Sequence, residues 1–241
     1  MTKPYTLYTA PTPNGRKAAI FFEEAGLPYE MHFIDILAGD QHTPEFLKLN
    51  PNNKLPVLID PDGPNGEEFV LWESGAILWY LAEKTGRFLP KEGADRHIVH
   101  QWLMFQMANL GPMAGQFGHF FFYAKEKHPY SIERYGNELN RQMGVMDRHL
   151  EGREWFAGDD FSIADMAIFP WVGLTLDNPE LPRRPNMIAW SDRMKARPGV
   201  MKGMSIMTED IRPEIVEGGH QGFGDEHRDQ LFGDSQYARN E

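Results

Sequence analysis

The chain has 241 residues, of which 41% are hydrophobic and 24% charged, so its composition is that of an ordinary globular protein with a sizeable core. With 35 acidic against 24 basic residues, the formal net charge is −11. Nucleic acids and anionic membranes are bound through Lys and Arg, so this charge argues against both as partners. Cysteine is absent, which excludes disulfides, thiolate metal sites and a cysteine nucleophile. Any sulfur chemistry must use a thiol brought by a ligand.

Membrane and metal signals are also missing. No run approaches the roughly 20 apolar residues that span a bilayer, and no apolar segment follows the polar start of the chain. The nine histidines lack ligand spacing, so we expect no metal. We therefore expect a cytoplasmic protein with small-molecule partners.

Residues 1–87 alternate strand-like and helical patterns. Strands are expected at 5–8, 30–33, 55–59 and 69–71, and helices at about 15–25, 44–49 and 74–85. Gly26 and Gly86 follow the first and last of these helices as C-caps, and Ser74 is expected to be the N-cap of the last one. The order β-α-β-(short α)-β-β-α fits a small mixed sheet with helices on both faces, which is the thioredoxin-like arrangement.

The rest of the chain has helical periodicity without a convincing strand, so residues 95–203 are expected to form an all-helical domain. Its helices are a long one that Pro112 bends or ends, one at about 132–150, one beginning near Phe161 and one at 187–196. Ser162 and Asp165 have the spacing of a capping box. The polar tail 204–241 shows no apolar stripe and is either a surface wrap or a disordered end.

Two local features suggest ligand binding. Pro56 begins an apolar strand although proline cannot donate to a sheet ladder. It either begins an edge strand or forms a cis Leu55–Pro56 turn that presents the backbone of Leu55 to an extended ligand. Ser74 at a helix N-terminus favours a carboxylate, and the preceding Glu73 favours an ammonium. Both charges occur on an α-amino-acid group, although a plain N-cap beside a solvated glutamate is the simpler alternative.

Together these segments resemble a known family. Leu55-Pro56-Val57-Leu58 followed by Glu73-Ser74-Gly75-Ala76-Ile77 resembles the glutathione-site signature of glutathione transferases, and residues 161–165 resemble the capping box of their helical domain. The segments 10–17, 39–41, 51–54, 111–113 and 130–135 are similar to the narrower nu class. The resemblance covers roughly residues 5–200 and implies a homodimeric, glutathione-dependent disulfide-bond oxidoreductase.

The resemblance also implies a set of site residues. One glutathione would be held by Asn14, Gln41, Lys54, Leu55, Pro56, Glu73 and Ser74. Arg134 would reach a second glutathione, or the glycine carboxylate of a disulfide-linked pair. Lys54 and Arg134 are cations suited to the carboxylates of glutathione. For Arg134, an i,i+4 ion pair with Glu138 is a rival.

The thiol of glutathione needs an activating group, because a thiol with a pKa near 8.5 is only about 3% ionised at pH 7. Thr12 and Asn14, in the loop between the first strand and first helix, are the expected donors to the thiolate. Tyr8 is a rival, because other transferase classes use an N-terminal tyrosine, but its place within a strand favours a packed sheet residue.

The expected reaction is thiol–disulfide exchange by glutathione thiolate. Conjugation of glutathione to an electrophile, or reduction of an organic peroxide, needs the same thiolate and is the enzymatic alternative. A non-enzymatic glutathione-binding or regulatory protein is the alternative from another class. The aromatic tract 117–123 is expected to be core or dimer interface, or the wall of an apolar second-substrate pocket.

Overall fold

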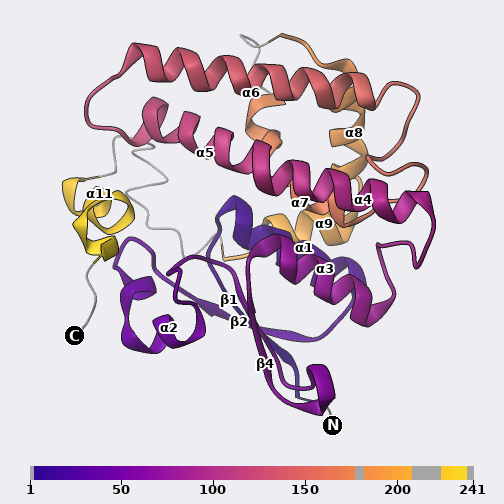
Figure 1. Ribbon diagram of the computed structural model, residues 1–241, viewed down its shortest axis with the longest axis horizontal. Helices are drawn as coiled ribbons and strands as arrows, with labels where there is room; N and C mark the ends of the chain where they lie inside the picture. Colours follow the sequence, from indigo (N-terminus) through magenta and orange to yellow (C-terminus); the bar gives the residue numbers. More distant parts are fainter. Residues whose placement is uncertain (1–2, 177–181, 208–223, 238–241) are drawn as a thin grey trace.

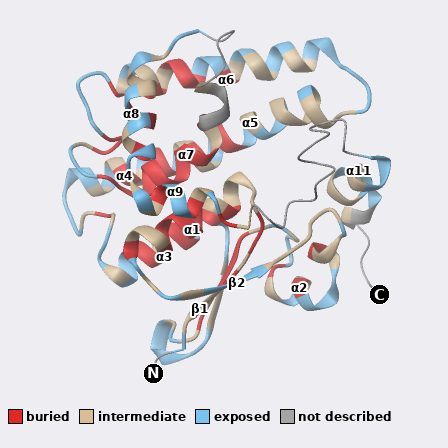
Figure 2. Ribbon diagram, turned by 180° about the vertical axis from the view of Figure 1, so that it is seen from behind, coloured by how far each residue is buried: buried red, intermediate tan, exposed pale blue. Residues whose placement is uncertain are grey.

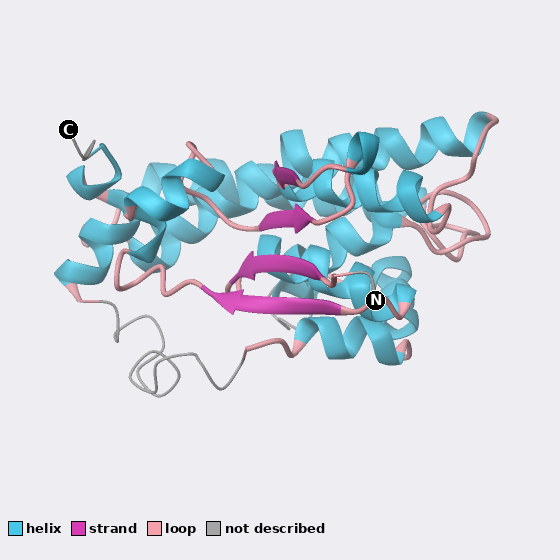
Figure 3. Cartoon of the chain, turned by 90° about the horizontal axis from the view of Figure 1, so that it is seen from below, coloured by secondary structure: helices cyan, strands magenta, loops and turns pink. Residues whose placement is uncertain are grey.

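The first part of the chain forms a four-stranded mixed sheet. In the computed structural model, which describes residues 3–176, 182–207 and 224–237, the strand order is β2-β1-β3-β4. Figure 1 shows the strands below helices α1 and α3. β1 (Tyr5–Thr9) pairs parallel to β2 (Tyr29–Phe33) and antiparallel to β3 (Val57–Asp60), which pairs antiparallel to β4 (Phe69–Trp72). Seen from below, the strands lie between helices (Figure 3). The predicted thioredoxin-like arrangement is confirmed.

Alternation along β1 assigns its two faces, because successive side chains of a strand point to opposite sides. Leu7 is fully buried in the main core, together with residues of α1 (Pro13–Ala25) and α3 (Ser74–Thr85). Tyr8 points the other way: its ring contacts Phe46 of α2 (Pro44–Leu49) and stacks on His32 at 4.9 Å between ring centroids. Short 3₁₀ turns η1 (Asp40–His42) and η2 (Pro64–Gly66) connect the remaining segments.

A helical half follows. One continuous helical stretch comprises α4 (Ala94–Phe105), the π-helical η3 (Gln106–Leu110), α5 (Gly111–Gly118) and the π-helical η4 (His119–Tyr123). Pro112 therefore does not end the helix as the sequence allowed: it follows directly on a π turn, where the hydrogen-bond register changes and the missing proline N–H is tolerated. The other helices are α6 (Pro129–His149), α7 (Ile163–Leu176), α8 (Pro185–Lys195) and α9 (Pro198–Met204), the last of which the sequence did not indicate.

The predicted capping box at the start of α7 is confirmed. Asp165 is fully buried and accepts hydrogen bonds from the Ser162 amide at 3.0 Å and the Ser162 hydroxyl at 3.1 Å. The Phe156 amide at 3.2 Å and Trp190 Nε1 at 2.8 Å also donate to it. One carboxylate thus ties α7 to the preceding loop and to α8. Buried residues concentrate on α7, α1 and α3 (Figure 2), so α7 lies at the centre of the core.

The end of the chain returns to the sheet half. Residues 208–223 of the predicted tail lie outside the described residues, but 225–237 form α11 (Asp225–Phe232) and the turn η7 (Asp234–Tyr237). Phe232 contacts the rings of His119 and Tyr123 at 4.6 and 5.6 Å, and Gln236 reaches Lys54. Part of the aromatic tract is therefore covered by this C-terminal segment, residues 225–237, rather than by the main core.

Candidate functional site

A pocket of about 220 Å³ lies where the β1–α1 loop meets the segments 36–41 and 53–55. Five of the predicted site residues line it: Thr12, Asn14, Gln41, Lys54 and Leu55. The sequence did not single out its other lining residues, which are Ile36, Asn53 and Leu231. Asn53 has a positive φ of 48°, and Leu231 comes from the C-terminal segment.

Thr12 and Asn14 have their acceptor atoms occupied inside the protein. Thr12 is the N-cap of α1, and its Oγ1 accepts a hydrogen bond from the Gly15 amide at 3.1 Å. Asn14 Oδ1 accepts from Trp171 Nε1 of α7 at 3.0 Å. The Thr12 hydroxyl proton and the Asn14 amide protons remain available as donors in the pocket. This is the arrangement that a bound anion such as a thiolate requires.

Of the two alternatives for Pro56, the structure has the cis Leu55–Pro56 bond. The first ladder pair of β3 is Val57 with Trp72, so Leu55 precedes the sheet ladder and lines the pocket. Across the pocket, buried Gln41 donates from Nε2 to the Ile36 carbonyl at 3.1 Å, while its Oε1 has no partner among the described residues. An amide oxygen that is buried without a partner is a ready acceptor for a ligand N–H.

Glu73 and Ser74 do not line this pocket but stand at the start of α3. The predicted N-cap is wrong by one residue: Glu73 is the N-cap, and Ser74 is the first helical residue. The Ser74 hydroxyl turns inward to Lys17 instead of back to the helix amides, and the N-cap Glu73 makes no side-chain hydrogen bond to these amides. Glu73 has φ 76°, a strained conformation for a residue with a side chain. The free amides can therefore receive a carboxylate.

Lys17 is a buried residue that the sequence did not indicate. Its side chain is 0% exposed, and Nζ donates to Ser74 Oγ at 3.2 Å, Gln106 Oε1 at 2.5 Å and Met107 Sδ at 3.4 Å. Burial lowers the pKa of Lys17 to about 7, with the charge of Glu73 acting weakly in the opposite direction. Gly75 makes this close approach possible, because a Cβ there would lie 2.7 Å from Met107 Cγ.

The lowered pKa of Lys17 predicts a pH dependence of stability. Between pH 7 and about 10.5 the unfolded chain holds a proton on Lys17 that the folded chain has lost, so stability rises with pH across this window. We expect wild-type stability relative to Lys17→Met to increase by up to about 1.4 kcal/mol per pH unit. Urea unfolding of both proteins at pH 7, 8 and 9 measures this difference. A constant difference across the three values would contradict the assignment.

Tyr8 and Arg134 lie outside the pocket. The Tyr8 ring packs on His32 and Phe46, as expected of a sheet residue. Arg134 is exposed on α6, and no ion pair among the described residues includes it. Its predicted rival partner, Glu138, is instead bound by Arg141 at 2.7 Å. Hydrogen bonds from Arg141 and Gln142 lower the pKa of Glu138 to about 2, with Arg134 contributing only through its charge.

The C-terminal segment occupies one end of the pocket. Gln236 Oε1 accepts a hydrogen bond from Lys54 Nζ at 3.1 Å, and the Gln236 carbonyl accepts from Asn53 Nδ2 at 3.3 Å. The Gln230 carbonyl lies 3.4 Å from Gln41 Nε2. The ammonium group of Lys54 is thus bound by a neutral amide oxygen of the same chain.

We expect Gln236→Ala to tighten glutathione binding by about two- to five-fold, because an exposed contact with a lysine ammonium is worth less than about 1 kcal/mol. Isothermal titration calorimetry of the variant against wild type measures the change. Asp234→Ala, an exposed change on the same turn, is the control and should leave affinity unaltered. Weaker binding by Gln236→Ala would instead mean that the segment supports the ligand.

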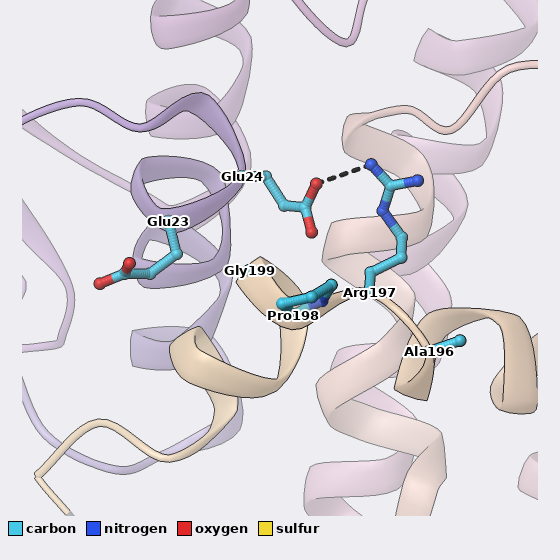
Figure 4. A pocket seen from close by; sticks show the side chains of 6 residues that line it. All are labelled: Glu23, Glu24, Ala196, Arg197, Pro198 and Gly199. Carbon is cyan, nitrogen blue, oxygen red and sulfur yellow. Dashed lines mark hydrogen bonds and ion pairs between the residues drawn. The ribbon is translucent and has the colours of Figure 1, made fainter.

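A larger cavity, of about 420 Å³, lies elsewhere, between the end of α1 and the α8–α9 junction (Figure 4). The carboxylate of Glu24 bonds Arg197 Nη2 at 2.6 Å and the Val200 amide at 3.0 Å. α9 presses closely on α1, because a Cβ on Gly203 would lie 2.5 Å from the Ile20 amide nitrogen. The charged side chains around this cavity are thus paired with each other. We interpret the cavity as part of the contact between the sheet half and the helical half.

The described residues offer neither a metal site nor a membrane span. They contain no group of three or more His, Asp or Glu side chains placed to hold a metal ion. None of their helices is both long and apolar enough to cross a bilayer.

Known proteins match this chain over most of its length. The family models described as glutathione S-transferase, N-terminal domain, and glutathione S-transferase, C-terminal domain, match residues 3–83 and 129–193. Disulfide-bond oxidoreductase YfcG of Escherichia coli is 46% identical over 210 residues, which are 86% of this chain and 97% of YfcG.

Two solved structures extend the comparison. A Burkholderia graminis glutathione transferase with two glutathione molecules bound per subunit has a TM-score of 0.80 and 44% identity, covering 85% of this chain and 89% of that one. A Pseudomonas putida glutathione transferase with one glutathione disulfide per subunit has a TM-score of 0.80 and 43% identity, covering 85% and 92%. The chain belongs to the glutathione transferase family. Within it, the chain is of the nu type, the group of the disulfide-bond oxidoreductases.

Proposed function

We propose that this protein is a glutathione-dependent thiol–disulfide oxidoreductase. The observation that carries the proposal is the pair of donors lining the pocket: the oxygens of Thr12 and Asn14 each accept a hydrogen bond from Gly15 or Trp171, which leaves their hydroxyl and amide hydrogens to donate to a ligand. Each donor to a thiolate stabilises the charged form by roughly 1.5–3 kcal/mol, or one to two pKa units. Bound glutathione then supplies the nucleophile that a chain without cysteine lacks.

The remaining contacts fit the two ends of glutathione. Lys54 would bind the glycine carboxylate, and the unpartnered Gln41 Oε1 and the backbone of Leu55 beside Pro56 would bind its peptide groups. Glu73 would bind the γ-glutamyl ammonium, and the free amides of α3 at Ser74 would bind the γ-glutamyl carboxylate.

The proposed reaction is thiol–disulfide exchange. The thiolate attacks one sulfur of a disulfide, forming a mixed disulfide and releasing the other sulfur as a thiolate that solvent protonates. A second glutathione thiolate attacks the glutathione sulfur of the mixed disulfide, which yields oxidised glutathione and releases the remaining substrate sulfur as a thiolate that solvent protonates.

Arg134 is our proposed contact for that second glutathione. Supporting this, the guanidinium is exposed, and Glu138 is held by Arg141 rather than by Arg134. A complex with oxidised glutathione in which Arg134 touches neither glycine carboxylate would contradict the assignment.

We further propose a cytoplasmic homodimer with a glutathione-binding domain at 1–87, a helical domain at 95–203 and a polar tail at 204–241. The cytosol supplies glutathione in reduced form. Exposed Trp72 on the edge strand β4 and exposed Met104 on α4 are apolar surface suited to a second subunit.

Activity with glutathione and 2-hydroxyethyl disulfide, beside a chloronitrobenzene electrophile, tests the function. We expect disulfide reduction well above the buffer rate and above conjugation. Conjugation alone would support the transferase alternative. Tight glutathione binding with neither activity would support a regulatory protein.

A further inference from the structure

The contacts of Lys17 suggest a role beyond packing. Its ammonium group touches a hydroxyl, an amide oxygen and a thioether, all neutral, and no ion pair among the described residues includes it. Burying an ammonium without an anion is costly, so a buried lysine of this kind tends to be neutral until a negative charge comes close.

Few other charges act on this group. Glu73, the N-cap of α3, is the carboxylate whose charge acts on Lys17, and the η3 partners Gln106 and Met107 are uncharged. Arg16 is the adjacent residue on α1. The charges on elements packed against α1 have partners of their own: Asp165 bonds Ser162 and Trp190, while Arg197 and Lys202 pair with Glu24 and Glu23.

Ser74 lies between Lys17 and the start of α3. Its hydroxyl accepts from Lys17 on the inner side, and its amide belongs to the uncapped first turn of α3. A carboxylate bound by the amides of that turn would be separated from Lys17 Nζ only by Ser74. Both Lys17 and Ser74 are buried, so little water would screen its charge. At short range and low dielectric, such a charge strongly favours the ammonium form.

We propose that Lys17 is a positioning residue for the γ-glutamyl carboxylate of glutathione, and that it takes up a proton from solvent when this carboxylate settles at the start of α3. The inference rests on the proposed function. It makes glutathione binding weaken as pH rises above neutrality, independently of any ionisation of the glutathione thiol. Through Gln106 and Met107, the same group links the occupied site to the π-helical η3 of the helical half.

Calorimetry with S-methylglutathione tests the proposal, because this ligand has no thiol to ionise. Titrations at pH 8 in buffers of different ionisation enthalpy measure the protons taken up. We expect an uptake on the order of half a proton per site more in wild type than in Lys17→Met. Lys48→Met, a change of an exposed lysine on α2, should retain the wild-type uptake.

The two possible failures can be told apart. Equal proton uptake by wild type and Lys17→Met overturns the proposal while leaving glutathione binding intact. No binding of S-methylglutathione to wild type overturns the proposed function as well.

A second measurement uses the unaltered chain, in case Lys17→Met does not fold. In protein labelled with ¹³C at the lysine ε-carbons, the signal that titrates near pH 7 should shift its midpoint upward by one unit or more when S-methylglutathione is added. An unchanged midpoint overturns the proposal.

Discussion

Asn14→Ala should lower kcat/KM for glutathione-dependent disulfide reduction about 10- to 100-fold. The variant loses a donor to the thiolate, and a hydrogen bond to a charged group is worth about 1.5–3 kcal/mol. Because the loss arises from a smaller thiolate fraction, we expect it to shrink as pH is raised toward 9, where glutathione ionises without help. Steady-state assays with 2-hydroxyethyl disulfide from pH 6.5 to 9 measure both effects.

Matched variants separate this role from its alternatives. Trp171→Phe keeps Asn14 but removes the indole N–H that orients it, so a smaller loss is expected. Thr12→Ala should lose a thiolate donor and also the N-cap of α1, worth about 1 kcal/mol of stability, whereas Thr12→Ser should keep both. If Tyr8→Phe abolished activity while Asn14→Ala did not, the site would be assigned to the wrong donor.

Asp165→Ala should destabilise the protein by about 3–5 kcal/mol. The change leaves the Ser162 amide and hydroxyl, the Phe156 amide and Trp190 Nε1 without their shared acceptor. Each buried donor left unpaired costs about 1 kcal/mol or more. The hydrogen bonds that connect α7 to α8 and to the preceding loop are lost at the same time. For a chain of this size, we expect the melting temperature to fall by roughly 10 °C.

The control for Asp165 lies in the loop that precedes α7. Asp160 is exposed, and Asp160→Ala should change the melting temperature by no more than about 2 °C. Asp165→Asn keeps one acceptor oxygen but turns an NH₂ group toward other donors, so its loss should be intermediate. A full loss with Asp160→Ala, or none with Asp165→Ala, would show that the capping box does not carry this stability.

The helix in the C-terminal segment could not be predicted from the sequence. Its composition is polar, and only the adjacent pair Leu231 and Phe232 is strongly apolar. Both make contacts: Leu231 lines the pocket and Phe232 covers His119 and Tyr123. A short helix with a single apolar pair has no periodic stripe to predict it, because its stability comes from the surface on which it lies.

Local features were predictable from the amino-acid sequence alone. The element order, the cis Leu55–Pro56 bond and the Ser162–Asp165 capping box each depend on residues close together in the chain. The absence of cysteine already required any thiol to come from a ligand. The segments around Pro56 and Ser74 then indicated which ligand family to expect.

Only the tertiary structure decided how the site is supported. Ser74 bonds Lys17, 57 positions away, Asn14 is oriented by Trp171 at a separation of 157, and Lys54 meets Gln236 at 182. No local pattern encodes such pairs, since each depends on how distant elements pack. In the sequence, Lys17 looks like an ordinary exposed lysine on a helix. It is buried only because α3 and η3 pack against this part of α1. The sequence therefore determined that a thiol-bearing ligand is needed. The packing of distant elements decided which side chains support the site, orient its donors and place a buried lysine beside it.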